Sequence, residues 1–177
     1  MRLTLVLAGA ALALAGCQSA ARIDPTPSFY RDLGRSSVET VDAAMAAQMI
    51  SGHRRNHGLG PVTLDPRLGD VARQMAQEAA RSDDLSATSR VALRERLARA
   101  GVATGNARDN SSAGYRTLAE AFSGWRGSRP HDAVMRHPGA THMGIATVTN
   151  PASRYRVFWV LVMAGPDGTV ALAPPAR

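Results

Sequence analysis

The stretch Val157-Phe158-Trp159-Val160-Leu161-Val162 decides which fold this sequence can adopt. Every residue in it is apolar, and β-branched and aromatic side chains dominate, which is typical of a β-strand. Successive side chains of a strand point to opposite faces of the sheet, so both faces of this strand must be covered. We therefore predict a central strand over 155–164 with other elements packed on both of its faces.

Three further elements are predicted just before this strand. Residues 142–149 predict a second strand, which a turn at Asn150-Pro151 joins to the first. A short helical turn is expected over 130–136. Thr117 and Glu120 have the spacing of a capping box, in which each side chain binds the other residue's backbone amide, and this predicts the start of a helix. The apolar side of that helix carries Ala121, Phe122 and Trp125.

The first half of the chain predicts three more helices. Ser36 and Glu39 form another capping-box pattern at the start of the first helix. Asp65 and Pro66 supply an N-cap and a proline at the first position of the second helix. The third covers 90–100. The buried stripe of the second helix would contain Leu68, Val71, Met75 and Ala79. Helices first and strands last indicate one α+β sandwich domain.

The N-terminus has the pattern of a secretory signal peptide. Arg2 precedes an apolar run over 3–14, which is too short to span a bilayer comfortably. The tetrapeptide Leu14-Ala15-Gly16-Cys17 resembles the lipobox of bacterial lipoproteins, so we expect a signal peptide over 1–17 and lipidation of Cys17. The alternative is an ordinary signal peptide in which Cys17 has no special role.

Composition limits which bonds and partners we expect for the rest of the chain. Cys17 is the only cysteine, so we expect neither a disulfide nor a thiolate metal site in the domain. The formal net charge of +7 favours an anionic partner such as phospholipid or an envelope polymer. The basic residues are scattered and aromatic residues are few, which argues against a nucleic-acid partner. We expect a flexible tether over 18–35, the domain over 36–165 and an irregular tail over 166–177.

Several short motifs follow one another in a recognisable order. They are Arg55-Asn56-His57-Gly58-Leu59, Leu64-Asp65-Pro66-Arg67-Leu68, Ala119-Glu120-Ala121-Phe122-Ser123-Gly124-Trp125, Ser128-Arg129-Pro130-His131 and Thr141-His142-Met143-Gly144-Ile145-Ala146. In order and spacing they resemble the bacterial branch of the CAP superfamily, which includes cysteine-rich secretory proteins, antigen 5 and pathogenesis-related 1 proteins. The resemblance implies a three-layer α-β-α sandwich with a small antiparallel sheet flanked by helices, and a further strand near 109–114.

In that family a surface cleft gathers two histidines and two acidic residues, and in several members it holds a divalent metal. The resemblance places one histidine of the cleft at His131 and puts Ala87 where the other histidine would stand. Asp109, followed by Asn110, takes the place of one acidic residue, and Ser128 takes the place of the other. The resemblance therefore implies a cleft that has lost part of its usual set of side chains.

Two histidine arrangements remain as candidate metal sites. Catalytic zinc normally takes three protein ligands, so His131 and Asp109 would hold a divalent metal such as zinc only weakly, with His142 or a water completing the site. Alternatively, His131 is a hydrogen-bonding residue that positions the short helix. His53 and His57 stand four residues apart without an acidic companion, and we interpret them as a solvated pair near a helix end.

These patterns predict a membrane-anchored CAP-domain lipoprotein of the bacterial cell envelope, located at the outer membrane and facing the periplasm. We expect a non-catalytic binding or structural module rather than an enzyme. Its expected partners are the membrane, through the lipid anchor, and a lipid or an anionic envelope polymer. Two alternatives stay open: a metal-dependent hydrolase acting on envelope material through His131 and Asp109, and a scaffold for another envelope protein.

Overall fold

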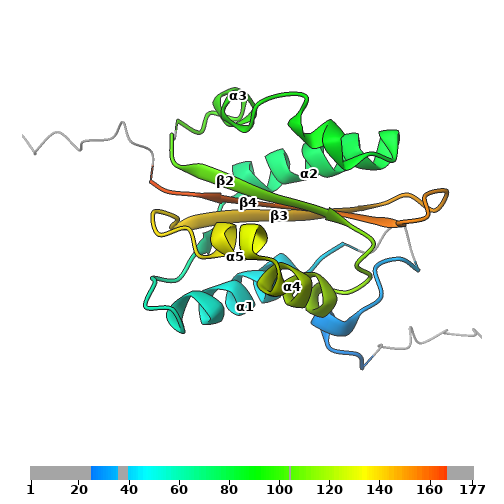
Figure 1. The fold of residues 1–177 in the computed structure, drawn as a ribbon, viewed down its shortest axis with the longest axis horizontal. Helices are drawn as coiled ribbons and strands as arrows, with labels where there is room; N and C mark the ends of the chain where they lie inside the picture. The colour runs from blue at the N-terminus through cyan, green and yellow to red at the C-terminus, as the bar shows by residue number, and fades with distance from the viewer. Residues whose placement is uncertain (1–24, 36–39, 104, 167–177) are drawn as a thin grey trace, which may run out of the picture.

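A four-stranded sheet in the order β1-β3-β4-β2 separates two layers of helices (Figure 1). The computed structural model describes residues 25–35, 40–103 and 105–166. Its strands are β1 (Thr63–Leu64), β2 (Ala107–Ala113), β3 (His142–Thr149) and β4 (Val157–Ala164). One face of the sheet carries α2 (Pro66–Ser82) and α3 (Leu93–Arg99), and the other carries α1 (Ala43–Arg55), α4 (Leu118–Gly127) and α5 (Arg129–Met135). The expected α+β fold, a three-layer α-β-α sandwich, is confirmed.

The central strand β4 is buried along its whole length. Alternate side chains point to opposite layers, so that Trp159 and Leu161 pack with α1 and α4 while Val160 and Val162 pack with α2. The strand begins at Val157 rather than at the predicted Tyr155. The reason is Arg156, whose φ of 62° lies outside the extended region that a strand requires.

The sheet is mixed rather than purely antiparallel, which corrects the expectation. Strands β2 and β3 both pair antiparallel with β4, and β2 lies where the resemblance implied a strand. Strand β1, however, pairs parallel with β3 through Thr63 and Leu64 only. A strand of two residues leaves no alternating pattern in the sequence, so it could not be predicted from periodicity.

Two helices begin where their capping signals predicted. The Asp65 side chain accepts a hydrogen bond from the Arg67 amide at the start of α2, and Pro66 occupies the first turn. At α4 the capping box is complete, because Thr117 Oγ1 accepts from the Glu120 amide and Glu120 Oε2 accepts from the Thr117 amide. The predicted buried stripe of α2 is confirmed, since Leu68, Val71, Met75 and Ala79 are all buried.

Helix α1 begins later than predicted. Its N-cap is Asp42, whose carboxylate accepts a hydrogen bond of 2.9 Å from the Met45 amide, and Ala43 is the first helical residue. The Val41 amide is held by Thr147 Oγ1 on β3 at 3.1 Å, which keeps the chain out of the helix at that point. The capping-box residues over 36–39 lie outside the described residues.

The segment expected to be a flexible tether packs against the domain over its second half. It contains η1 (Ser28–Tyr30), a single 3-10 turn. Leu33 is buried in the core; its amide donates to Arg116 O at 2.8 Å, and its carbonyl accepts from Thr149 Oγ1 at 3.1 Å. Leu33 and the partly buried Phe29 both pack in the core cluster of α1 and α4, and this fixes this part of the chain to the domain.

Several predictions fall outside the residues that the structure describes. They concern the signal peptide and Cys17, the first half of the tether over 18–24 and the C-terminal tail beyond Pro166. Within the described residues, no helix combines the length and apolar character needed to cross a membrane.

Candidate functional site

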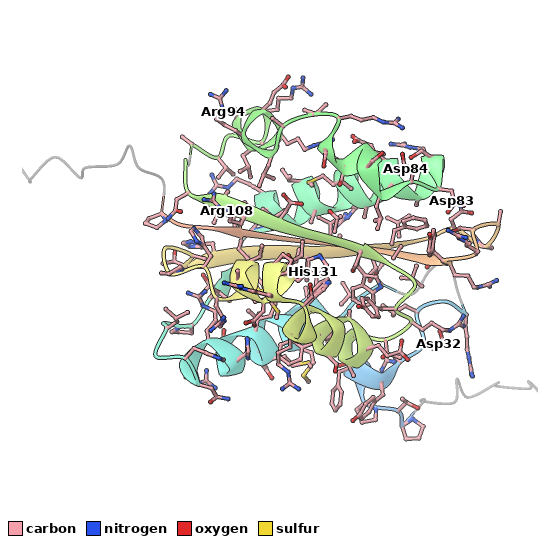
Figure 2. The ribbon with its side chains drawn as sticks, viewed as in Figure 1. Asp32, Asp83, Asp84, Arg94, Arg108 and His131 are labelled. Carbon is pink, nitrogen blue, oxygen red and sulfur yellow. The ribbon has the colours of Figure 1, made fainter. Side chains whose placement is uncertain are left out.

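His131 lies on α5, on the side of the sheet that also carries α1 and α4 (Figure 2). Its backbone carbonyl accepts a hydrogen bond of 3.0 Å from Asn110 Nδ2 on β2. Ser128 stands at the N-cap of α5, but its side chain makes no capping hydrogen bond there. Two of the predicted cleft residues, Asn110 and His131, are therefore brought together directly, and Ser128 lies one turn away on the same short helix.

Asp109 is not brought together with His131. In β2, Asp109 pairs with Val162, which packs against α2, whereas Asn110 pairs with Leu161, which packs in the cluster of α1, α4 and α5. Paired residues of an antiparallel sheet share a face, so the Asp109 side chain lies on the opposite face of the sheet from Asn110 and α5. The expected cleft centred on both His131 and Asp109 is therefore corrected.

The surroundings of Asp109 are those of a partly buried carboxyl group. Burial raises its pKa above the ordinary value, while a hydrogen bond of 3.3 Å from Ser111 Oγ and the nearby positive charge of Arg96 act in the opposite direction. Because burial outweighs both, the ionised form of Asp109 is less favourable in the folded protein than in the unfolded chain.

Ala87, which replaces the second family histidine, is buried in η2 (Leu85–Ser89). The same region contains an ion pair that replaces neither missing ligand. Arg96 binds both carboxylate oxygens of Glu78, at 2.8 and 2.6 Å, and also donates to Thr88 O at 3.4 Å. A guanidinium that binds a carboxylate through two hydrogen bonds makes a strong contact, so Arg96 joins α3 to α2 beside η2.

Asn110 is almost fully buried, with 1% of its surface exposed. Its Nδ2 is used by His131 O, but its Oδ1 has no hydrogen-bond partner among the described residues. An asparagine at this position therefore holds α5 against β2 through one bond. This bond uses the backbone carbonyl of His131, so it does not decide between the two roles predicted for the His131 side chain.

His131 and Asp109 are not placed to hold one divalent metal between them. No group of three or more histidine, cysteine, aspartate or glutamate side chains is gathered as a metal site within the described residues. Of the four cleft positions that the resemblance indicates, this chain has a histidine at one, His131, and a carboxylate at another, Asp109, and the sheet separates the two. A metal held by His131 and Asp109 together is not compatible with this register.

A histidine-carboxylate pair does form, but elsewhere. His53 Nε2 on α1 lies 2.6 Å from Asp132 Oδ1 on α5, and both side chains are largely buried. The other carboxylate oxygen of Asp132 lies 2.7 Å from Arg136 Nε. The His57 ring contacts the His53 ring edge to face and bonds His53 O through Nδ1 at 2.9 Å. The interpretation of His53 as part of a solvated pair was wrong, because its acidic companion comes from a distant helix.

The structure also gives a structural role to Arg54, which the sequence did not single out. Its side chain is buried, and burial lowers its pKa from the ordinary value. The guanidinium donates four hydrogen bonds of 2.8–2.9 Å to the carbonyls of Gly60, Met135, His137 and Ala140. No signal in the sequence separates Arg54 from its exposed neighbour Arg55.

Comparison with known proteins agrees with this architecture. The model of a family described as the cysteine-rich secretory protein family, CAP, matches residues 47–163. None of the curated proteins is similar enough in sequence to match the chain.

Three solved structures share the fold. An extracellular protein containing an SCP domain from Bacillus anthracis has a TM-score of 0.60 at 20% identity, with 70% of this chain and 40% of that chain covered. An outer surface protein from Borrelia burgdorferi has a TM-score of 0.59 at 13% identity, with 70% and 91% covered. A cysteine-rich secretory protein from Staphylococcus aureus has a TM-score of 0.54 at 18% identity, with 69% and 37% covered. The match thus spans less than half of the Bacillus and Staphylococcus proteins.

Proposed function

The chain belongs to the cysteine-rich secretory protein (CAP) family, and we propose that it serves as a non-catalytic domain of the bacterial cell envelope. One observation carries the non-catalytic part of the proposal. Asp109 and His131 lie on opposite faces of the sheet, so they cannot act on one bound group. The metal-dependent hydrolase that would work through this pair therefore loses its geometric basis.

The envelope location rests on the N-terminal sequence. The apolar run and the Leu14-Ala15-Gly16-Cys17 motif support export followed by lipidation of Cys17. Among the proteins that share the fold, one is described as extracellular and another as an outer surface protein, and both come from bacteria. Together these observations support a lipid-anchored domain, for which we propose the outer membrane and its periplasmic side.

The charge of the chain supports an anionic partner. A net charge of +7 favours acidic lipids or acidic envelope polymers, and it can also attract an acidic protein. The role that fits a CAP domain without an assembled cleft is binding or support, in which the fold presents a surface rather than a reaction centre.

Metal titration of the full chain, purified from membranes in detergent, tests the non-catalytic proposal. A ligand specific for the native state should stabilise it by about 2.7 kcal/mol at a hundredfold excess over Kd. We expect no saturable rise in melting temperature with Zn²⁺, Mg²⁺ or Ca²⁺. A saturable rise that His131→Ala abolishes, and that Arg55→Ala at an exposed position leaves unchanged, would contradict the proposal.

A further inference from the structure

Beyond Met143, no strand among the described residues lies beside the outer edge of β3. Strand β1 pairs with β3 only at His142 and Met143, whereas β4 pairs with the inner edge along the whole strand. The Met143 carbonyl accepts from the Asp65 amide at 2.9 Å, which shows that the backbone groups of Met143 point to the outer edge. Because backbone direction alternates with a period of two, the amides and carbonyls of Ile145 and Thr147 point the same way.

These outward groups have no hydrogen-bond partner in the described part of the domain. Among the residues that the structure describes, none forms a hydrogen bond with the backbone amide or carbonyl of Ile145 or Thr147. An unpaired strand edge is a template for another strand, and folded proteins usually block it with charges, prolines or a covering segment. Between Ile145 and Thr149 this strand contains no proline and no charged residue.

A groove follows this edge. It has a volume of about 550 Å³, and residues 145–149 line it together with Thr40, Val41 and Ala43 on one side and Arg73 and Gln77 of α2 on the other. A second hollow of about 460 Å³ shares Gln77, Val148 and Thr149 and continues the groove to Arg81 and Pro151. The unpaired edge therefore forms the floor of a channel with one wall from each helical layer.

The α2 wall of the groove is basic. Arg73, Gln77 and Arg81 stand four residues apart on α2 and are all exposed, so they form one row along the helix. The ion pair between Arg73 and Asp70 is 3.9 Å long and exposed on both sides, so it neutralises Arg73 only weakly. No acidic residue is among the described residues that line the groove. The groove therefore favours an acidic occupant.

We propose that this groove binds an extended acidic segment of a partner protein, which adds to the sheet as a further strand beside β3. The backbone of the segment would bond the outward groups of Ile145 and Thr147. Arg73 and Arg81 are eight residues apart on a helix, or about 12 Å, and residues i and i+4 of a strand are about 13 Å apart. Carboxylates four residues apart would therefore meet the two arginines, while the small apolar residues between them face Val41 and Ala43.

This inference goes beyond the proposed function and does not depend on Cys17. Its test uses the full chain in detergent and labelled peptides containing Glu-Val-Ser-Val-Glu, with binding followed by fluorescence anisotropy. We expect saturable binding that is tighter than that of Lys-Val-Ser-Val-Lys. Arg73→Gln and Arg81→Gln should each weaken it by up to about fivefold, the range of an exposed charge pair. The control Arg94→Gln, on α3, should leave it unchanged.

Backbone contact is tested separately, by hydrogen exchange and by N-methylated peptides. The peptide should slow exchange at the Ile145 and Thr147 amides, while the Ala146 amide, which faces β4, stays as before. N-methylation of the alternate peptide residues whose amides face β3 should abolish binding. N-methylation of the intervening residues, whose amides face away from β3, should leave binding unchanged. The proposal fails if no peptide binds, if both methylation patterns bind equally well, or if the Ile145 and Thr147 amides are already protected in the chain alone, whether by itself or by a second copy.

Discussion

Arg54 connects the end of α1 to the segment that follows α5, and its four carbonyl partners lie in two stretches of chain. We expect Arg54→Met to lower the free energy of unfolding by about 3–5 kcal/mol, because buried carbonyls lose their donors. The free energy of unfolding of Arg54→Lys should lie between those of the original chain and of Arg54→Met, because lysine keeps the positive charge but has fewer hydrogen-bond donors. Urea unfolding measures both variants. Arg55→Met at the exposed neighbouring position is the control, and an equal loss there would contradict the assigned role.

Asp109 provides a pH-dependent prediction. Its folded-state pKa is raised by burial, so its ionisation reduces stability as the pH rises above the unfolded value of 3.8. Asp109→Asn should therefore stabilise the fold at pH 7 by about 1 kcal/mol, the scale of one poorly solvated polar group, and by less at pH 4.5. Thermal unfolding at both pH values checks this result. Asp70→Asn, at an exposed site on α2, is the control, and an equal gain at both pH values for Asp109→Asn would contradict the explanation.

At the residue scale, the sequence identified single side chains but not their neighbours. His131, Asp109 and Asn110 were recognised as candidates, yet their distribution over the two faces of β2 follows from its register with β4. His53 and Asp132 are 79 residues apart and Arg54 and Ala140 are 86 apart. Contacts at such separations depend on how the helices pack, and no local pattern records them.

Among the elements, α2 packs closely on β3 at Gly144. A Cβ atom built on Gly144 would lie 2.1 Å from Gly69 N and 2.1 Å from Leu68 C, which are both backbone atoms of α2. Gly144→Ala should therefore cost about 3 kcal/mol or more, since the helix must move away from the sheet. Chemical denaturation measures the loss.

Gly69→Ala is the matched control for that prediction. A Cβ atom on Gly69 would meet nothing within 4 Å, and alanine favours the helix over glycine by up to about 1 kcal/mol. This variant should be neutral or stabilising. If Gly144→Ala unfolds at the same denaturant concentration as the original chain, α2 does not pack on β3 as closely as described.

At the element scale, prediction succeeded where a local signal sets the boundary. The N-cap at Asp65 and the capping box at Thr117 fixed the starts of α2 and α4, because both rest on hydrogen bonds within one turn. It failed at α1, where Asp42 rather than Ser36 provides the cap and Thr147 on another element holds Val41. Where two residues such as Ser36 and Asp42 could each cap a helix, a tertiary contact decides at which of them the helix begins.

For the whole molecule, the proposed lipidation of Cys17 would decide where the domain acts. We expect the full chain, produced in a bacterial host with two membranes, to fractionate with the outer membrane and to take up labelled fatty acid. Cys17→Ser should abolish the labelling and the attachment of the processed chain, because stable anchoring needs the acyl chains. Arg54→Met or His131→Ala should still be labelled. Labelling that persists in Cys17→Ser would contradict the anchor.

The sequence by itself predicted the central strand, the five α-helices apart from the start of α1, the layered α+β fold and the family. It did so because periodicity and caps are local and because burial of β4 on both faces demands two covering layers. Only the tertiary structure decided that Asp109 and His131 are separated by the sheet and that His53 meets Asp132. It also decided that, among the described residues, no strand pairs with the outer edge of β3 beyond Met143. These facts depend on strand register and on helix packing, which bring distant residues together without leaving a pattern along the chain.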